Sequence, residues 1–114
     1  MPTQEIPRAQ WNNFFDSFSR QHEGWLVTLE VFGSTIGAQQ EVRQIPFEEI
    51  IVEHGNSQSL VIILGKSRNH FSHTIKEPKH VWIQRTPKGA DESLEIEDED
   101  DTKVLLRFRS TEGH

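Results

Sequence analysis

The chain has 114 residues, a formal net charge of −6 and no cysteine. This length predicts one domain over residues 1–114, and the lack of cysteine excludes disulfides, thiolate metal sites and cysteine nucleophiles. Residues 1–10 show no signal-peptide pattern, and the longest apolar run, residues 60–64, is too short to cross a bilayer. We therefore expect a cytoplasmic protein without a membrane-spanning segment.

An amphipathic helix is predicted over about residues 7–21. Four aromatic side chains recur at spacings of three and four and so share one helix face: Trp11, Phe14, Phe15 and Phe18. Pro7 suits the first helical turn, where its missing N–H costs nothing, and Gly24 is a natural C-terminal stop. Such a stripe can bind a partner, but it is more often part of the core, and we expect it to pack inside the protein.

The hydrophobic period changes to two after Gly24, which predicts a β-rich region over about residues 25–109. The expected strands cover about residues 25–32, 38–44, 60–64, 70–76, 80–85, 93–97 and 103–109. Residues 46–54 fit either a short helix that begins at Pro46 or one more strand, and their β-branched run favours the strand. The C-terminal residues 110–114 are expected to be frayed.

These elements predict an α+β fold in which the N-terminal amphipathic helix packs on an antiparallel sheet of roughly seven or eight short strands. Regular strand spacing with polar turns indicates a meander that forms a barrel or a half-barrel, with the helix over its open face or end. The polar segment 38–44 is expected at a sheet edge, where Pro46 is tolerated. The segment 60–64 is apolar on both faces, which is typical of a central strand.

Three of the six histidines lie close together in the chain: His70, His73 and His80. Their spacing resembles that of metal ligands, but residues three apart on a strand point to opposite faces, which separates His70 from His73. His80 follows the turn at Pro78 and could still approach either one, yet no metal, no cofactor and no catalytic residue is predicted. The candidate binding residues of this segment are His70, His73, Lys76, His80 and Trp82.

The charge is unevenly spread along the chain. Residues 91–101 hold eight of the 18 acidic groups, whereas residues 66–88 carry six Lys and Arg against Glu77 alone, a net charge of +5. Two neighbouring strand segments that attract each other across the sheet explain this pattern simply. The alternative is a basic face for an anion or a nucleic acid, built from Lys66, Arg68, Lys76, Lys79 and Arg85.

Two stretches imitate known motifs but lack a required residue. Residues 60–67 imitate a phosphate-binding loop, yet Leu60 stands where that loop needs glycine, and no helix is expected to follow. Residues 91–103 invite a calcium-loop interpretation, yet Lys103 stands where that loop needs glycine. A nucleotide hydrolase is therefore not expected, and the acidic stretch is interpreted as a solvated hairpin tip.

Three stretches resemble a family of short bacterial proteins of unknown function: residues 6–33, 70–78 and 94–108. The most specific parts are His22-Glu23-Gly24-Trp25 and His73-Thr74-Ile75 followed by Pro78. The resemblance implies a bacterial, cytoplasmic, stand-alone domain and carries over no catalytic residue.

The function expected from these observations is a non-enzymatic binding or protein-interaction module, because no catalytic constellation is recognisable. An anion or nucleic-acid binder that uses the basic segment 66–88 is the first alternative. A small hydrolase or metal-dependent enzyme centred on His73 is the second, although a histidine that shares a strand face with Phe71 and Ile75 is more often structural. The expected partner is a protein or a second copy of the chain, and a nucleic acid is less favoured.

Overall fold

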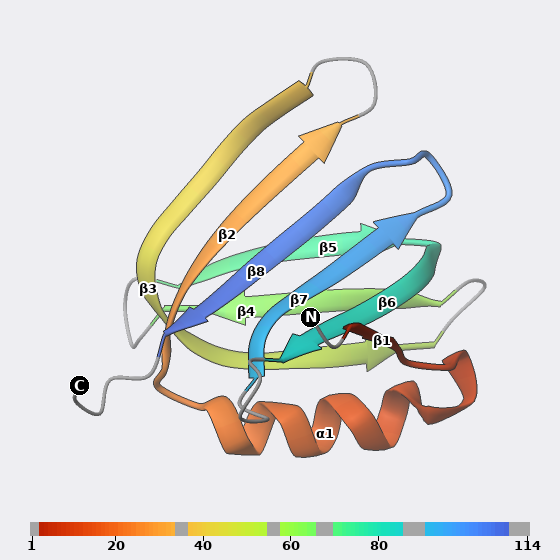
Figure 1. Ribbon diagram of the computed structural model, residues 1–114, viewed down its shortest axis with the longest axis horizontal. Coiled ribbons are helices and arrows are strands. Elements are labelled where there is room, and N and C mark those ends of the chain that lie inside the picture. The colour runs from red at the N-terminus through yellow and green to blue at the C-terminus, as the bar shows by residue number, and fades with distance from the viewer. Residues whose placement is uncertain (1–2, 34–36, 55–57, 66–69, 86–90, 110–114) are drawn as a thin grey trace.

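The computed structural model describes residues 3–33, 37–54, 58–65, 70–85 and 91–109 (Figure 1). They form one α-helix and eight strands, so the predicted α+β class is confirmed. The elements are β1 (Thr3–Glu5), a 3-10 turn (Arg8–Gln10), α1 (Trp11–His22), β2 (Leu26–Gly33), β3 (Gly37–Glu53), β4 (Ser59–Leu64), β5 (Phe71–Lys76), β6 (Pro78–Arg85), β7 (Asp91–Asp98) and β8 (Lys103–Arg109). The expected frayed residues 110–114 lie outside the described ranges, as do Lys66, Ser67, Arg68 and Lys88.

All eight strands belong to one antiparallel sheet with the order β1-β6-β7-β8-β2-β3-β4-β5. Two meanders, β2 to β5 and β6 to β8, are joined where β8 pairs with β2. The sheet stays open, with β1 and β5 as its outer strands, which confirms the half-barrel alternative. The sequence pattern does not predict β1, because three residues are too few to show a period.

The strand β3 has 17 residues and bends so that it serves two parts of the sheet. Its first part pairs with β2, its second part pairs with β4, and the change falls between Pro46 and Phe47. The backbone of Gln44 lies in the left-handed region (φ 55°), which marks the bend, and Pro46 is tolerated where one ladder ends. The two predicted segments 38–44 and 46–54 are thus one strand, and the helix alternative for 46–54 is wrong.

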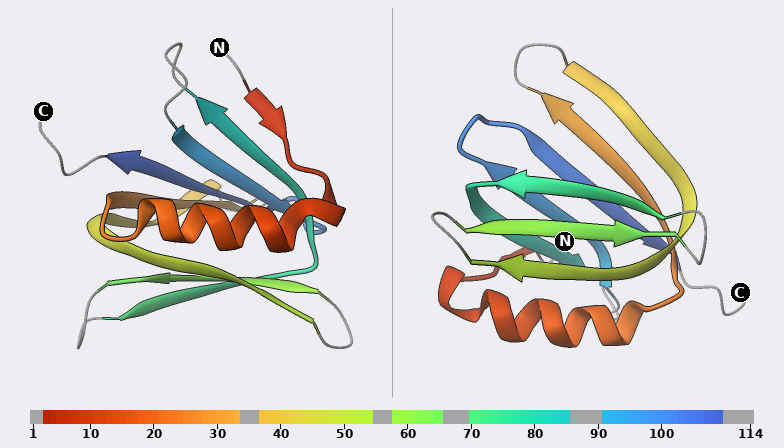
Figure 2. Two further views of the ribbon diagram at one scale, coloured as in Figure 1. Left: turned by 90° about the horizontal axis from the view of Figure 1, so that it is seen from below. Right: turned by 180° about the vertical axis from the view of Figure 1, so that it is seen from behind.

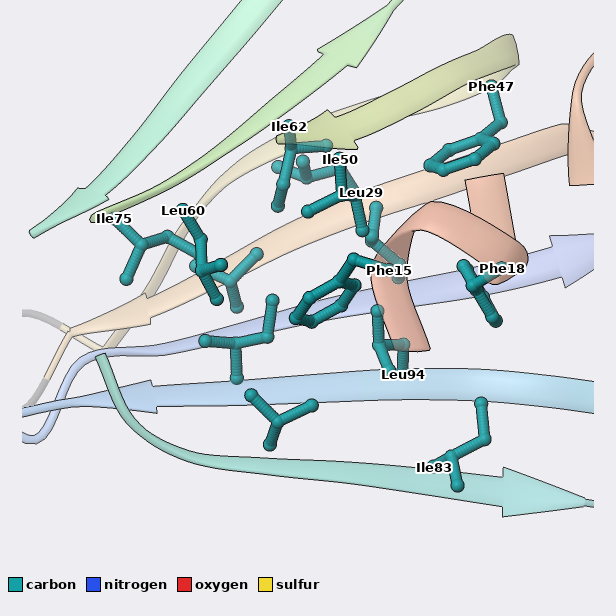
Figure 3. Close-up of a cluster of buried hydrophobic side chains, with 14 of the residues drawn as sticks. Phe15, Phe18, Leu29, Phe47, Ile50, Leu60, Ile62, Ile75, Ile83 and Leu94 are labelled. Atoms are coloured by element: carbon teal, nitrogen blue, oxygen red, sulfur yellow. The ribbon is translucent and has the colours of Figure 1, made fainter. Parts of the chain in front are cut away.

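The bend divides the sheet into two layers that face each other. We call β1, β6, β7, β8, β2 and the first part of β3 the six-stranded layer, and the remainder of β3 with β4 and β5 the three-stranded layer. Figure 1 shows the six-stranded layer in front, and the right view of Figure 2 shows the three-stranded layer from behind. The core lies between them, where Leu29, Ile62 and Leu94 are 0% exposed (Figure 3).

Helix α1 lies along the free edge of the second part of β3 and covers the opening between the layers (Figure 2). Most of its aromatic stripe is in the core as predicted, since Trp11, Phe15 and Phe18 are each at most 3% exposed. Phe14 is only half-buried and stacks on Phe18 with a centroid distance of 5.4 Å. Burial of a large aromatic side chain stabilises a fold by about 1.5–3 kcal/mol, so the stripe anchors the helix.

Hydrogen bonds from α1 and from the segment after it satisfy the free edge of β3. The N–H of Ile50 donates to Ser19 Oγ over 2.9 Å. The N–H of Phe47 donates to the carbonyl of Trp25 over 2.7 Å, and the N–H of Gly24 donates to the carbonyl of Phe47 over 2.8 Å. Gly24 has a φ of 89°, which glycine adopts without strain. The helix and its exit segment therefore take the place of a further strand at this edge.

Candidate functional site

The structure places the five candidate residues in four separate locations. His70 lies directly before β5. His73 lies on the inner face of β5, whereas Lys76 is exposed near the end of that strand. His80 and Trp82 lie together on the outer face of β6. The five side chains therefore do not converge, and the described part of the chain contains no group of three His, Cys, Asp or Glu side chains that could hold a metal ion.

His73 is half-buried at the edge of the core. Phe71 and Ile75 flank it on the same face of β5, and Ile62 lies opposite on β4. Burial lowers the pKa of His73 below its usual value of 6.5, and the charge of Asp98 partly opposes this shift. A neutral imidazole with apolar neighbours is typical of a structural histidine, which makes an enzyme centred on His73 a weaker hypothesis than a binding module.

The lowered pKa of His73 can be measured by following its imidazole protons by NMR as the pH is changed. We expect a midpoint below 6.5 in the folded protein, and a further decrease in Asp98→Asn because the opposing charge is removed. The folded protein should also lose stability as the pH falls below 6.5, because the unfolded chain then binds a proton that the folded chain takes up less readily. A midpoint above 6.5 would contradict this account.

Asp98→Asn is a suitable variant because it keeps the local turn. Asp98 Oδ1 accepts hydrogen bonds from the N–H groups of Asp100, over 2.8 Å, and Thr102, over 3.0 Å. The Asn side-chain oxygen can accept the same two bonds, so only the charge near His73 changes. The thermal melting of Asp98→Asn at pH 8 serves as the control for folding.

Two other histidines contact neighbouring groups of the protein, one in the core and one at the surface. His22, in one of the family-like stretches, is 3% exposed, and its Nδ1 lies 2.9 Å from the carbonyl of Phe18. Its ring stacks on Phe18 at 4.1 Å and meets Trp25 at 4.6 Å. His70 Nδ1 lies 3.7 Å from Glu48 Oε1 in a pair that is largely exposed and therefore contributes little stability.

The outer face of β6 brings an aromatic ring between two carboxylates. His80 Nδ1 lies 2.6 Å from Glu5 Oε2, and the His80 ring stacks on Trp82 with a centroid distance of 5.1 Å. Trp82 lies opposite Glu5 on β1 and opposite Glu95 on β7. Side chains directly opposite on antiparallel strands lie about 4.5–5.5 Å apart at Cβ. The Trp82 ring therefore has an acidic neighbour on each side.

A depression of about 570 Å³ lies on this outer face and extends from Trp82 across β7 to β8. Trp82 and Leu105, both half-buried, supply its apolar surface, and Glu95 and Arg107 supply charge. Arg107 Nη2 lies 3.4 Å from Glu30 Oε1, a distance at which the charges attract. This ion pair is not a hydrogen bond, and Glu30 Oε1 is buried without a hydrogen-bond partner among the described residues. We call this hollow the outer depression.

The strand pattern of the sequence places His80 and Trp82 on one face but does not show their neighbours on other strands, which are Glu5, Glu95 and Leu105. Glu5 belongs to the unpredicted strand β1, and Glu95 belongs to a segment interpreted as solvated. The sequence does contain one sign of an apolar site on this surface, because Leu105 is an apolar residue on the otherwise charged face of its strand.

The described cations of the basic segment do not form one face. Lys76 shares a shallow depression with Glu77, Asp98 and Asp100, so carboxylates surround it. Arg85 lies at the far end of β6, where its Nη1 donates to Gln4 Oε1 over 2.9 Å. Lys66, Arg68 and Lys88 belong to the residues that are not described. Lys79 is exposed near the start of β6, at the other end of that strand from Arg85. The carboxylates around Lys76 make that part of the described surface a poor site for an anion.

The described residues thus define a small α+β protein with one helix on an open, eight-stranded antiparallel sheet and a depression on its outer face that is lined by apolar and charged side chains. In the ranges that the structure describes, no helix is long and apolar enough to cross a membrane.

Comparison with known proteins identifies the family of the chain. The chain belongs to a family of unknown function (DUF5335), whose sequence model matches residues 2–113. An uncharacterized protein of Aquifex aeolicus (strain VF5) is 28% identical over 109 residues, which are 96% of this chain and 94% of that protein. These matches confirm the predicted resemblance to a bacterial family of unknown function.

The fold is similar to that of the Bacillus subtilis YojF protein, seen in its crystal structure. The TM-score is 0.55 at 8% sequence identity, and the match covers 100% of this chain and 99% of that chain. At this identity the similarity supports the fold alone.

Proposed function

We propose that the protein is a non-enzymatic binding module whose outer depression holds a basic segment of a protein partner. The observation that carries the proposal is the half-buried pair Trp82 and Leu105, which line the outer depression with Glu95 and Arg107. On the neighbouring strands Glu5 lies opposite Trp82, and Glu30 lies opposite Leu105. An apolar patch of this kind on a solvent-facing sheet surface is typical of a binding site. Its acidic neighbours select a partner of positive charge.

An arginine or lysine side chain fits this chemistry. A cation within about 6 Å of a tryptophan ring is attracted by its π-electrons, and a guanidinium can pair with a carboxylate through two parallel hydrogen bonds. Glu95 lies directly opposite Trp82 and can pair with such a cation, while Leu105 can contact its aliphatic part. The formal net charge of −6 would also speed the approach of a basic partner.

The alternatives receive less support from the described residues. A nucleic acid would meet the carboxylates around the outer depression, and Lys76 is itself beside acidic groups. The proposed location is the cytoplasm, where a domain that is stabilised by its core and contains no cysteine needs no oxidising environment.

A peptide of alternating arginine and serine is a direct probe of the outer depression. We expect it to shift the backbone NMR signals of Trp82, Glu95 and Leu105, with binding that weakens as salt is added. The exchanges Trp82→Ala and Glu95→Gln should each weaken binding by roughly tenfold, because each removes a cation partner.

Glu49→Gln is the matched control, since it removes one carboxylate from the other layer and should leave the affinity unchanged. Glu95→Gln keeps the shape of the side chain, so it also tests the proposal if Trp82→Ala lowers stability. Equal binding of a glutamate–serine peptide, or signal shifts confined to another surface, would overturn the proposal. Tighter binding of a single-stranded RNA oligonucleotide would instead favour the nucleic-acid alternative.

A further inference from the structure

The outer face of the three-stranded layer carries a regular grid of nine side chains. Three rows cross β3, β4 and β5 in register: Glu49, Ile63 and Ser72; Ile51, Val61 and Thr74; Glu53, Ser59 and Lys76. We call this surface the outer grid. Its apolar members are Ile51, Val61 and Ile63, and all three are only half-buried.

No described element lies over the outer grid in the right view of Figure 2. The opposite face of β4 is fully covered, since Leu60, Ile62 and Leu64 are 0% exposed. An antiparallel sheet with one solvated face normally alternates apolar and polar residues, but β4 is apolar on both faces. Its sequence therefore has the composition of a strand that is covered on both sides, while the described chain covers only one.

We infer that a second copy of this chain covers the outer grid, and that the two copies are related by a two-fold axis parallel to β4. In this arrangement β4 of one copy faces β4 of the other, so Val61 meets Val61 and Ile63 meets Ile63 across the axis. The β3 column of each copy faces the β5 column of its partner, which is the self-complementary geometry of a two-fold interface.

The charges on the outer grid select this axis. With the axis parallel to β4, Glu53 of each copy faces Lys76 of the other, which makes two symmetric ion pairs. With the axis perpendicular to β4, Glu49 of one copy would face Glu53 of the other, and the like charges would repel. Neither Glu53 nor Lys76 makes an ion pair within the described part of one chain.

The size of the outer grid limits the strength of the association. Strands about 4.8 Å apart and residues about 3.3 Å apart along each strand give a contact smaller than the roughly 800 Å² per partner of a stable interface. Asp98 and Asp100 also lie near Lys76 and compete for its charge. We therefore expect a reversible dimer with a dissociation constant of roughly 10 μM to 1 mM.

Sedimentation velocity over protein concentrations from about 5 μM to 1 mM tests the inference, since this range spans the expected dissociation constant. The apparent mass of the wild type should increase with concentration from that of one chain towards that of two chains. Val61→Lys places two like charges at the axis and should weaken the dimer by at least about tenfold. The matched control is Thr28→Lys, which places a lysine at another half-buried position, on the outer face of the six-stranded layer and outside the outer depression, and should leave self-association unchanged.

Charge exchange tests the orientation of the two copies. Glu53→Lys and Lys76→Glu should each weaken the dimer, whereas an equimolar mixture of these two variants should form a heterodimer in which both facing pairs are again of opposite charge. The double variant Glu53→Lys/Lys76→Glu should recover self-association. Both positions are exposed, so melting temperatures near that of the wild type would show that the three variants fold.

Two results would overturn the inference: a wild type that stays at the mass of one chain throughout, or a dimer that Val61→Lys and both charge variants leave unchanged. Failure of the mixture to associate more strongly than either variant alone would overturn the proposed axis. None of these outcomes depends on the outer depression, so they do not decide the proposed function.

Discussion

Replacing Phe15 by alanine should lower the free energy of unfolding by about 3–5 kcal/mol, the largest effect of any change considered. Phe15 is 1% exposed and projects from α1 towards the core between the layers (Figure 3). Its removal leaves a cavity lined by side chains of both layers, and the better helix propensity of alanine recovers well under 1 kcal/mol. Urea denaturation followed by circular dichroism measures the difference.

Phe14→Ala is the matched control for this prediction, because it makes the same chemical change one residue away on the same helix. Phe14 is half-buried, so we expect roughly half the loss that Phe15→Ala causes. Equal losses at the two positions would show that burial of Phe15 between the layers does not anchor the helix.

Replacing Ser19 by alanine should lower the free energy of unfolding by about 1–3 kcal/mol. Ser19 Oγ accepts the hydrogen bond from the N–H of Ile50, and both residues are buried. The variant leaves this N–H at the free edge of β3 without a partner, which costs more than the loss of an exposed bond. Hydrogen exchange of the Ile50 amide should also become faster relative to the other amides of β3.

Ser17→Ala provides the comparison, since it removes a hydroxyl two residues earlier on the same helix. Ser17 is half-buried, and the hydrogen bond that it accepts comes from exposed Gln21 over 3.4 Å. We expect this change to be neutral or slightly stabilising, because alanine favours the helix. A loss as large as that of Ser19→Ala would argue that helix capping or propensity, and not the edge of β3, explains the effect.

Local periodicity predicts those elements in which apolar residues lie on the face towards the core and polar residues lie on the face towards solvent. The spacing of Trp11, Phe15 and Phe18 identifies the helix, and alternation identifies most of the strands. Periodicity could not show that residues 37–53 form one strand, because a proline such as Pro46 normally interrupts a strand. Pro46 is tolerated here because it lies where β3 changes from one pairing partner to the other. Periodicity also could not show β1, whose pairing with β6 spans about 80 residues of sequence.

The candidate site was predictable only where its residues belong to one strand. His80 and Trp82 are two apart, so they must share a face, and the structure places them in contact. His70, His73 and Lys76 are also close to His80 in sequence, but they belong to β5 or directly precede it, and β5 lies in the other layer from β6. The acidic neighbours of Trp82 come from β1 and β7, whose order beside β6 depends on the pairing of distant strands.

The bend in β3 has a consequence for errors in strand alignment. In most sheets a slip of one residue reverses the faces of a single ladder. Here the same backbone sets the alignment with β2 on one side of the bend and with β4 on the other. Insertion of one residue before Gln44 would shift the register with β2 and leave the register with β4 unchanged. Without the bend, β3 could pair with only one of these two strands. The bend at Gln44 and Pro46 thus separates the two registers, so the pairing of β3 with β2 can be set independently of its pairing with β4.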